Sequence, residues 1–366
     1  MRVVLSGGGT AGHINPALAL AEALIERGVD VRFAGTPQGV EARLVAQAGI
    51  PFTPFAASGF NRSHPLSLVK GVATIARSSM AAKRWFSEIR PDVVVGFGGY
   101  VSIPVGRAAV SLGIPLVVHE QNSVMGMANK YLARKARTVC LTYEHAARAL
   151  ADTSNVRITG NPVRASVLTA TREEGRALLG IPLDARMLLV FGGSLGARRI
   201  NEAAVALKER LLSYDDLYVV HVSGPAEYES VRDALALTFD EEKRWKLFGY
   251  QDRMGETMAA ADAIVSRAGA TSLAEISARA IPALLVPFPY ATEDHQTTNA
   301  RAYVEAGCAY AIADADTATP EFARLVCSLV EDADVRERMA AAARAQKTRD
   351  AAALLADAVM EAAGAQ

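Results

Sequence analysis

Two stretches of the chain decide the fold: VVLSGGGTAGH at residues 3–13 and LLVFGGSLGAR at residues 188–198. Each begins with a run of apolar residues, continues with a glycine-rich turn and leads into a helical pattern. An unbroken apolar run is typical of a parallel strand that is buried on both faces, and the order strand, turn, helix is typical of α/β sheets. The repetition predicts two Rossmann-like, doubly wound parallel-sheet domains.

Short apolar runs alternate with helical patterns along the rest of the chain as well. The expected strands cover residues 3–5, 31–34, 93–95, 116–118, 138–141, 188–191, 218–222, 245–248, 263–265 and 283–286. The turn-forming run GNP at 160–162 is the expected join. We therefore predict an N-terminal domain over 1–161 and a C-terminal domain over 162–340. The Ala-rich stretch 341–366 is expected to be helical and to pack back on the first domain.

Composition excludes several classes of protein. The 366 residues suffice for two domains, and 51% are hydrophobic. The three cysteines are scattered, so we expect neither a disulfide framework nor a zinc site, and a reducing compartment fits. We also expect no signal peptide and no transmembrane helix, because the N-terminus leads directly into a strand and apolar runs stay short of the roughly 18–20 residues that span a bilayer.

The overall net charge of zero hides a difference between the two halves. Residues 1–160 contain 17 Lys and Arg against 9 Asp and Glu, whereas residues 161–366 contain 22 against 30. The N-terminal half is thus basic and the C-terminal half acidic to the same extent. Different charge predicts different binding partners for the two halves.

The glycine-rich turns predict an anion site. Backbone N–H groups at a helix N-terminus favour phosphate, so a diphosphate could be held there without a metal. Residues 7–12 match the GxGxxG dinucleotide fingerprint, but the second expected strand ends in FAGT at 33–36, without the acid that would hold the NAD ribose. Polar clusters also follow other expected strands, and ligands of open α/β sheets bind at such strand ends. These clusters predict one cleft with two walls.

Six blocks, taken together, resemble the MurG family of bacterial N-acetylglucosaminyltransferases. They are GGTAGHxxP at 8–16, HEQN at 119–122, GNPVR at 160–164, GGSxGARxxN at 192–201, SRAGATSxxE at 266–275 and DHQxxNA at 294–300. They run in family order across nearly the whole chain. One departure is Ala11, where the family usually has glycine; alanine is the mildest replacement unless the position needs a positive φ.

The resemblance implies the GT-B fold, two Rossmann-like domains that face each other across a cleft. It implies UDP-GlcNAc as the donor on the C-terminal domain and a polyprenyl-pyrophosphoryl muramoyl-peptide (lipid I) as the acceptor on the N-terminal domain, with lipid II as product. From the helix N-termini we also expect no metal cofactor. The implied donor contacts are Thr10, Ala11, Gly12, Asn122, Arg164, Ser194, Gln251, Ala270, Thr271, Ser272, Leu273, Ala274, Glu275 and Gln296. Among them, Glu275 resembles the ribose-hydroxyl acceptor and Gln296 a reader of the sugar hydroxyls.

Two residues are candidates for the base that deprotonates the acceptor hydroxyl. His13 follows the first glycine turn, and an unperturbed imidazole titrates at about pH 6.5. Its alternative role is to bind the diphosphate or to cap the helix. Glu120 is the competing base or an orienter of His13, and its alternative is a buried structural carboxylate. Asp314-x-Asp316 resembles a metal motif of another glycosyltransferase fold, but a solvated loop with cap residues is the favoured interpretation.

A basic segment suggests contact with a membrane. No acidic residue occurs between Glu41 and Glu88, and Lys70, Arg77 and Arg84 are spaced by seven. With the neighbouring Trp85 and Phe86, this pattern predicts a helix drawn to anionic lipid headgroups. The alternative is an ordinary helix whose apolar stripe packs on the sheet. We also expect Tyr100 to contact the acceptor or the membrane.

We therefore expect a peripheral enzyme at the cytoplasmic face of the bacterial inner membrane, with cell-wall synthesis proteins as partners and no nucleic-acid partner, because no nucleic-acid-binding motif accompanies the basic segment. Within the fold, the alternatives are a glycolipid synthase or a UDP-sugar 2-epimerase. From other classes, they are an NAD-linked reductase and a non-catalytic sugar-nucleotide sensor.

Overall fold

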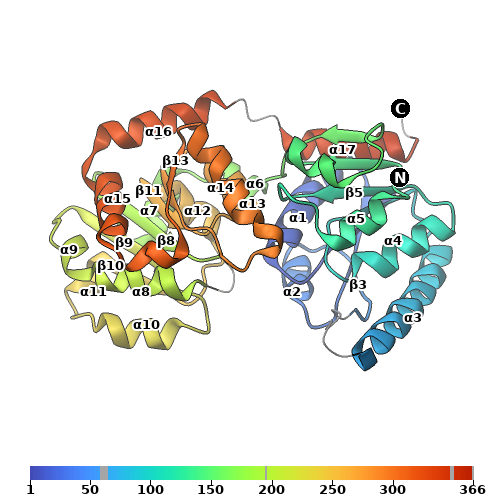
Figure 1. Ribbon diagram of the computed structural model, residues 1–366, viewed down its shortest axis with the longest axis horizontal. Helices are drawn as coiled ribbons and strands as arrows, with labels where there is room; N and C mark the ends of the chain where they lie inside the picture. Colours follow the sequence, from blue (N-terminus) through green and yellow to red (C-terminus); the bar gives the residue numbers. More distant parts are fainter. Residues whose placement is uncertain (58–64, 194–195, 347–349, 365–366) are drawn as a thin grey trace. The chain divides into compact units, whose positions relative to one another are not determined.

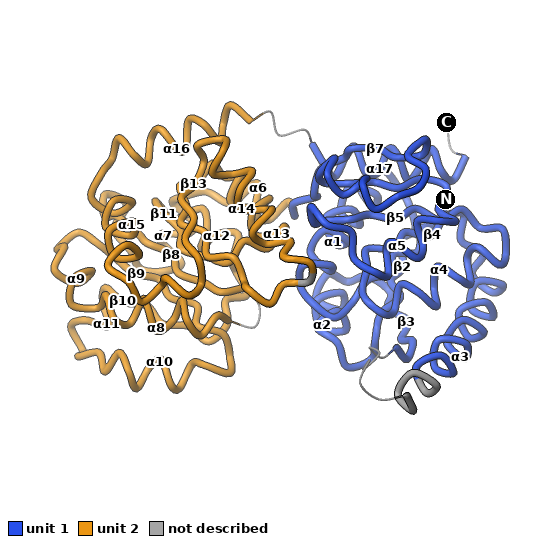
Figure 2. The backbone as a smooth tube through the Cα atoms, viewed as in Figure 1, with its two compact units in different colours: residues 1–164, 349–366 blue, residues 165–348 orange. Residues whose placement is uncertain are grey.

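A computed structural model describes residues 1–57, 65–193, 196–346 and 350–364, without the side chains of residues 65–70 and 292. The chain divides into two compact units. Unit 1 comprises residues 1–164 and 349–366, and unit 2 comprises residues 165–348 (Figure 2). The chain thus leaves unit 1 once and returns to it at its C-terminal end.

Unit 1 is built on one sheet of seven parallel strands in the order β3-β2-β1-β4-β5-β6-β7 (Figure 1). Helices cover both faces of this sheet, each face with its own apolar core. The strands are β1 (Arg2–Ser6), β2 (Asp30–Gly35), β3 (Phe52–Pro54), β4 (Val93–Gly96), β5 (Leu116–Glu120), β6 (Thr138–Leu141) and β7 (Val156–Ile158). The helices are α1 (Ala11–Glu26), α2 (Val40–Gln47), α3 (Pro65–Ile89), α4 (Ser102–Ser111), α5 (Met127–Ala133), the 3-10 helix η1 (Glu144–Ala149) and α17 (Ala351–Ala362).

Unit 2 repeats this plan with six parallel strands in the order β10-β9-β8-β11-β12-β13. The strands are β8 (Arg186–Phe191), β9 (Leu217–Val222), β10 (Trp245–Phe248), β11 (Ala263–Ser266), β12 (Ala283–Leu285) and β13 (Ala309–Ala311). The helices are α6 (Ala165–Thr169), α7 (Arg172–Leu179), α8 (Arg198–Ala206), α9 (Lys208–Leu212), α10 (Tyr228–Leu235), α11 (Glu241–Arg244), α12 (Met254–Ala260), α13 (Ala270–Ala278), α14 (His295–Glu305), α15 (Pro320–Glu331) and α16 (Ala333–Ala345), with the 3-10 helices η2 (Thr292–Asp294) and η3 (Asp314–Ala318).

Both sheets change winding direction at their first strand. In unit 1 the order reverses between β1 and β4, and in unit 2 it reverses between β8 and β11. The first glycine loop (residues 7–10) follows β1, and the second glycine loop (residues 192–197) follows β8. A reversal of strand order opens a crevice at the carboxyl ends of the strands, where α/β proteins bind ligands. The prediction of two similar parallel-sheet units is confirmed.

The C-terminal helix α17 packs in unit 1. Leu355 and Val359 are fully buried in the same core cluster as residues of α1. At the edge of this contact, Arg27, the C-cap residue of α1, donates to Asp357 at 2.7 Å. Residue 340, the expected domain boundary, lies inside α16, so the chain leaves unit 2 only after that helix.

Among the helices of the described residues, α3 is the longest, with 25 residues. Across the part of the chain that the structure describes, neither this helix nor any other has the length and apolar character to cross a bilayer.

Candidate active site

The first glycine loop holds His13 in a defined orientation. The Nδ1 atom of His13 lies 3.0 Å from the carbonyl oxygen of Gly8. Since a carbonyl oxygen only accepts, Nδ1 carries the proton in this contact, and neutral imidazole then has its lone pair on Nε2. The same Nε2 edge faces the loop after β4, because a Cβ built on Gly98 would lie 3.2 Å from Nε2. His13 therefore lies in the crevice between β1 and β4.

Ala11 and Gly12 are the first two residues of α1, with Thr10 as the N-cap. Ala11 is helical, and positive φ angles in this loop belong to Gly9, at +90°. Alanine therefore suits position 11 without backbone strain, which accounts for the departure from the family pattern.

Glu120, at the end of β5, is 2% exposed and its carboxylate is fully engaged. Oε1 accepts from the backbone N–H and the side-chain amide of Asn122, at 3.0 and 3.2 Å. Oε2 accepts from the N–H of Gly126 and the amide of Asn129, both at 2.9 Å. A carboxylate with four donors organises the 120–129 loop. Its surroundings favour the positioning role over that of base.

The sequence analysis missed Asn129, a residue of α5 that is 2% exposed. Its Nδ2 atom donates to Glu120 and to the carbonyl oxygen of His119, at 2.9 and 3.0 Å. A Cβ on Gly98 would lie 3.5 Å from this Nδ2 and 3.2 Å from Nε2 of His13. Asn129 thus connects the loop after β5 with the surroundings of His13. An asparagine inside a short helix is the signal that could have indicated it.

His119 is a structural residue. It is fully buried, and burial lowers its pKa to about 4. Its Nε2 lies 2.9 Å from the carbonyl oxygen of Gly160, and its Nδ1 lies 3.1 Å from the side-chain amide of Gln121. Neutral imidazole satisfies both contacts, with Nε2 donating and Nδ1 accepting. His119 therefore ties β5 to the turn that ends the N-terminal half.

The second glycine loop rests on neutral groups. Gly196 has a φ of +80°, and a Cβ there would collide with the carbonyl oxygen of Ser223. The same carbonyl accepts from the amide of Asn201 at 2.9 Å, and Asn201 Oδ1 lies 3.0 Å from Nε2 of His221. Burial lowers the pKa of His221 to about 4. Ser194, the predicted diphosphate donor, lies outside the described residues.

Most of the remaining donor residues lie at strand ends of unit 2. Residues Ala270 to Glu275 form the first turns of α13, directly after β11. Ser272 and Ala274 are partly exposed, Thr271 and Glu275 are largely buried, and the side chain of Leu273 lies in the core. Position 273 therefore offers a ligand its backbone only.

Gln296 and Gln251 already have backbone partners. The Oε1 atom of Gln296 accepts from the N–H of Phe288 at 2.9 Å. The Oε1 atom of Gln251 accepts from the N–H of Arg253 at 3.0 Å. Arg164 is the last residue of unit 1 before α6.

Asp314 contradicts the expectation of a solvated loop. Its side chain is 10% exposed and forms ion pairs with Arg267 at 2.5 Å and with Arg199 at 3.2 Å. Of the two acids in this motif, only Asp316 is exposed. Burial beside two guanidinium groups explains the difference, since a carboxylate is buried readily only when it is paired. Within the described residues, no group of three His, Cys, Asp or Glu side chains is arranged to hold a metal ion.

The expected membrane segment is only partly exposed. Arg77 and Arg84 are exposed on α3, together with Val72 and Met80. Phe86 is 1% exposed and lies in the core of unit 1, so its expected membrane role is wrong. Trp85 is half-buried, with its ring centroid 5.4 Å from that of Phe86. The side chain of Lys70 lies outside the described residues. Tyr100, after the Gly98–Gly99 turn, is 48% exposed.

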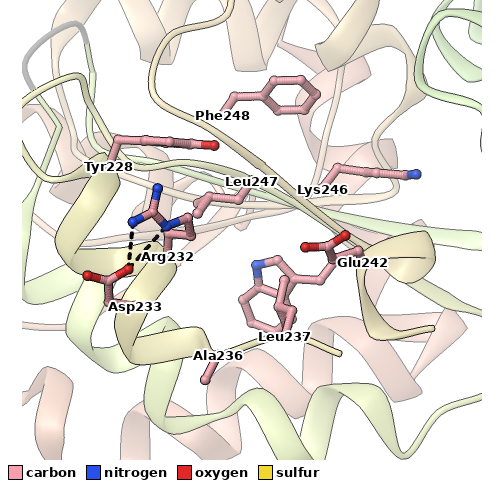
Figure 3. Close-up of a pocket in the computed structure, with 10 residues that line it drawn as sticks. Tyr228, Arg232, Asp233, Ala236, Leu237, Glu242, Lys246, Leu247 and Phe248 are labelled. Carbon is pink, nitrogen blue, oxygen red and sulfur yellow. Dashed lines mark hydrogen bonds and ion pairs between the residues drawn. The ribbon is translucent and has the colours of Figure 1, made fainter. Parts of the chain in front are cut away.

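A pocket of about 670 Å³ lies elsewhere in unit 2, along the edge strand β10 and beside α10 (Figure 3). Its walls include Leu237, Trp245 and Phe248, and Arg232 at its rim is paired with Asp233. None of the described donor residues lines it. Its size therefore does not make it the active site.

Two protein-family domain models match the chain, one over the sheet of each unit. The glycosyltransferase family 28 N-terminal domain matches residues 3–141, and the family 28 C-terminal domain matches residues 187–355. This chain belongs to glycosyltransferase family 28. The N-terminal match contains the first glycine loop, and the C-terminal match contains the second.

Relatives over the full length place the chain in the MurG family. The UDP-N-acetylglucosamine–N-acetylmuramyl-(pentapeptide) pyrophosphoryl-undecaprenol N-acetylglucosamine transferase of Halothermothrix orenii is 39% identical, with 93% of both chains covered. The enzyme of the same name from Lactiplantibacillus plantarum is 41% identical, with 96% of this chain and 97% of the relative covered. The crystal structure of MurG from Acinetobacter baumannii superposes with a TM-score of 0.72 at 28% identity, covering 98% and 99%.

More distant structures share the fold alone. A crystal structure from Listeria monocytogenes, named as a putative UDP-N-acetylglucosamine 2-epimerase, superposes with a TM-score of 0.70 at 17% identity. The match covers 97% of this chain and 94% of the other. The same fold thus supports a different reaction on a UDP-sugar, so the residues of the site have to distinguish the two.

Proposed function

We propose that this chain transfers N-acetylglucosamine from UDP-GlcNAc to the polyprenyl-pyrophosphoryl muramoyl-peptide lipid I and so forms lipid II for peptidoglycan. MurG membership and the names of the full-length relatives support this activity. Among the residues of the site, the orientation of His13, with its proton on Nδ1 toward Gly8, supports it most directly. A transfer to a hydroxyl needs a base, and a 2-epimerase does not use an acceptor hydroxyl at all.

In the proposed reaction, Nε2 of His13 accepts the proton of the acceptor hydroxyl as its oxygen attacks the anomeric carbon. Attack comes from the face opposite the diphosphate, so the bond between the sugar and UDP breaks and the α-linked donor gives a β-linked product. Glu120 and Asn129 position the loop beside His13. Arg164 and the N-termini of α8 and α13 stabilise the charge on the leaving UDP, and no metal is required.

Donor recognition is proposed to fall to unit 2. Glu275 would accept hydrogen bonds from the ribose hydroxyls. Gln296 would bind the sugar hydroxyls through its Nε2 amide, because its Oε1 atom already accepts from the N–H of Phe288. Thr10, Gly12 and Asn122 are proposed as further donor contacts. The acidic excess of the C-terminal half is compatible with this role, because helix N-termini supply the local positive potential.

The exposed face of α3 is proposed to rest on an anionic membrane surface at the cytoplasmic side of the inner membrane. This face presents Arg77 and Arg84 together with the exposed apolar side chains Val72 and Met80. Apolar side chains beside guanidinium groups suit the boundary between headgroups and acyl chains. Liposome flotation with and without anionic lipid tests it: an Arg77→Ala/Arg84→Ala protein should float less, and lipid-independent behaviour of the unaltered protein would refute it.

The activity is tested by UDP release from UDP-GlcNAc in the presence of a lipid I analogue, with UDP-GalNAc and UDP-glucose as competing donors. Acceptor-dependent release with preference for UDP-GlcNAc is expected, and it should persist in EDTA. Conversion of UDP-GlcNAc without acceptor would indicate an epimerase, and binding without turnover a sensor. Loss of activity in EDTA that Mn²⁺ or Mg²⁺ restores would refute the metal-independent mechanism.

A further inference from the structure

A buried carboxylate lies directly beneath the first glycine loop. Glu41, in the first turn of α2, is 0% exposed. Its Oε1 accepts from the backbone N–H and the hydroxyl of Thr36, at 3.0 and 2.6 Å. Its Oε2 accepts from the N–H of Gly9 at 3.3 Å. The carboxylate thus joins the end of β2 to the loop that follows β1.

The chain around this carboxylate is shaped to hold it. A Cβ on Gly8 would lie 2.5 Å from Oε1 of Glu41, and a Cβ on Gly35 would lie 2.7 Å from its Cγ. A Cβ on Gly39 would collide with both carboxylate oxygens. Three glycines, from three different segments, therefore leave room for one side chain. Such a cradle exceeds what a helix needs from an acidic residue in its first turn.

The direction of the side chain separates Glu41 from an ordinary helix-terminal acid. An acid in the first turn stabilises its own helix through the free N–H groups there. The hydrogen bonds of Glu41 go instead to Thr36 and to Gly9, which is 32 residues away in sequence. The residue next to Gly9 is Gly8, and the carbonyl oxygen of Gly8 receives Nδ1 of His13 at 3.0 Å. A short chain of contacts thus leads from the carboxylate to the imidazole.

This arrangement also changes how the dinucleotide fingerprint is understood. In a dinucleotide-binding fold, an acid near the end of the second strand binds the ribose hydroxyls. Here the carboxylate near the end of β2 belongs to Glu41, and it points into the protein at the glycine loop. Glu41 therefore does not replace the ribose-binding acid, which the end of β2 lacks.

We propose that Glu41 is a positioning residue that fixes the first glycine loop and, through Gly8, the orientation and tautomer of His13. This inference rests on the proposed function in one respect, namely that His13 is the base of the transfer. Removal of the carboxylate leaves the N–H of Gly9 without its acceptor, so the neighbouring Gly8 carbonyl can move. Nδ1 of His13 then loses its hydrogen-bond acceptor, and the ring proton is no longer held on Nδ1. The donor contacts in unit 2 are unaffected, and only those of Thr10 and Gly12 move with the loop.

Kinetics of Glu41→Gln test the proposal. Glutamine keeps the shape but places an amide where the N–H of Gly9 or Thr36 needs an acceptor. We expect kcat to fall by about 10- to 100-fold, because a displacement of a catalytic group by about 1 Å has an effect of that size, with the KM for UDP-GlcNAc within about twofold. Glu26→Gln, the same change at an exposed residue of α1, is the matched control and should leave both constants unchanged.

A double-mutant cycle with His13→Ala separates positioning from general destabilisation. If Glu41 acts through His13, Glu41→Gln should have little further effect on kcat once the imidazole is absent. Full additivity of the two losses would overturn the proposal, as would an unchanged kcat in Glu41→Gln. Thermal unfolding is measured alongside, and a loss of activity that only follows the loss of folded protein also counts against it.

Nuclear magnetic resonance of ¹⁵N-histidine-labelled protein provides a readout without turnover. The His13 signals, assigned with His13→Ala, should show the Nδ1–H tautomer in the unaltered protein and a shift toward Nε2–H in Glu41→Gln. An unchanged tautomer would refute the mechanism. If Glu41→Gln does not fold, Glu41→Asp takes its place, with the same direction and a smaller effect expected. Failure of the unaltered protein to transfer sugar would refute the proposed function instead, while the tautomer result would still stand.

Discussion

The two glycine loops occupy the same place in the same topology, yet they rest on different chemistry. Beneath the first loop lies the carboxylate of Glu41, which accepts the N–H of Gly9, and beside it lies His13. The second loop rests on the neutral Asn201 and the carbonyl oxygen of Ser223, and it leads into α8, which begins with two arginines. A buried negative charge disfavours an anion above it, whereas a neutral base and a helix N-terminus favour one.

This difference suggests how one repeated fold serves two substrates. The first loop is suited to hold a proton acceptor, and the second to hold a diphosphate. Topology alone would assign phosphate to both loops, since both follow a strand at which the strand order reverses. The local charge beneath each loop therefore decides which half of the reaction it serves.

The largest expected effect comes from removing the proton acceptor of the first loop. In His13→Ala, kcat should fall by about 10³-fold, which is within the range for loss of a general base, while the KM for UDP-GlcNAc stays within about twofold. His145→Ala, an exposed histidine in η1 of the same unit, is the control and should be unaffected. If His13→Ala instead weakened donor binding at unchanged kcat, both loops would be phosphate sites and the comparison would fail.

The next effect concerns the surroundings of the second loop. Asp314→Asn removes the negative charge that pairs with Arg267, and the guanidinium of Arg267 stays buried without it. Loss of one partner of a buried ion pair should lower the free energy of unfolding of unit 2 by about 3 kcal/mol in urea titrations. Asp316→Asn, two residues further and exposed, should change it by less than about 0.5 kcal/mol. Comparable losses at both positions, reversed by added metal, would point to a cation site instead.

Two buried asparagines allow the loops to be compared directly. Asn129→Ala, in unit 1, removes a donor to Glu120 near His13 and should lower kcat about tenfold at nearly constant donor KM. Asn201→Ala, in unit 2, leaves the carbonyl of Ser223 without its amide and should raise the KM for UDP-GlcNAc about tenfold instead. Steady-state kinetics on both variants is the measurement. The same pattern of change in both would show that the loops are not specialised.

The sequence predicted the parts that depend on local pattern. Unbroken apolar runs and glycine turns identified both sheets, and the order of motifs identified the family. Contacts between distant segments were not predictable in this way. Glu41 and Thr36 look like surface residues in sequence, and their role appears only when β2 lies beside β1. Phe86 was misassigned because a helix that is half core and half exposed has aromatic residues on either face, and only packing shows which.

A further expected effect is a pH dependence of stability that the two units share. His119 in unit 1 and His221 in unit 2 are buried, and burial lowers the pKa of each to about 4. The unfolded chain binds these protons already below about pH 6.5, so the unfolded state gains protons first and stability is lost as the pH falls from about 6.5 toward 4. The slope approaches about 1.4 kcal/mol per pH unit for each histidine.

Urea unfolding between pH 7.5 and 5 measures this slope. His221→Asn removes the titration in unit 2 and should leave only the contribution of His119, so the slope with pH should fall by about half. His145→Ala, with an exposed imidazole, should leave it unchanged. A slope that persists in both His221→Asn and His119→Asn would mean that other groups carry the pH dependence.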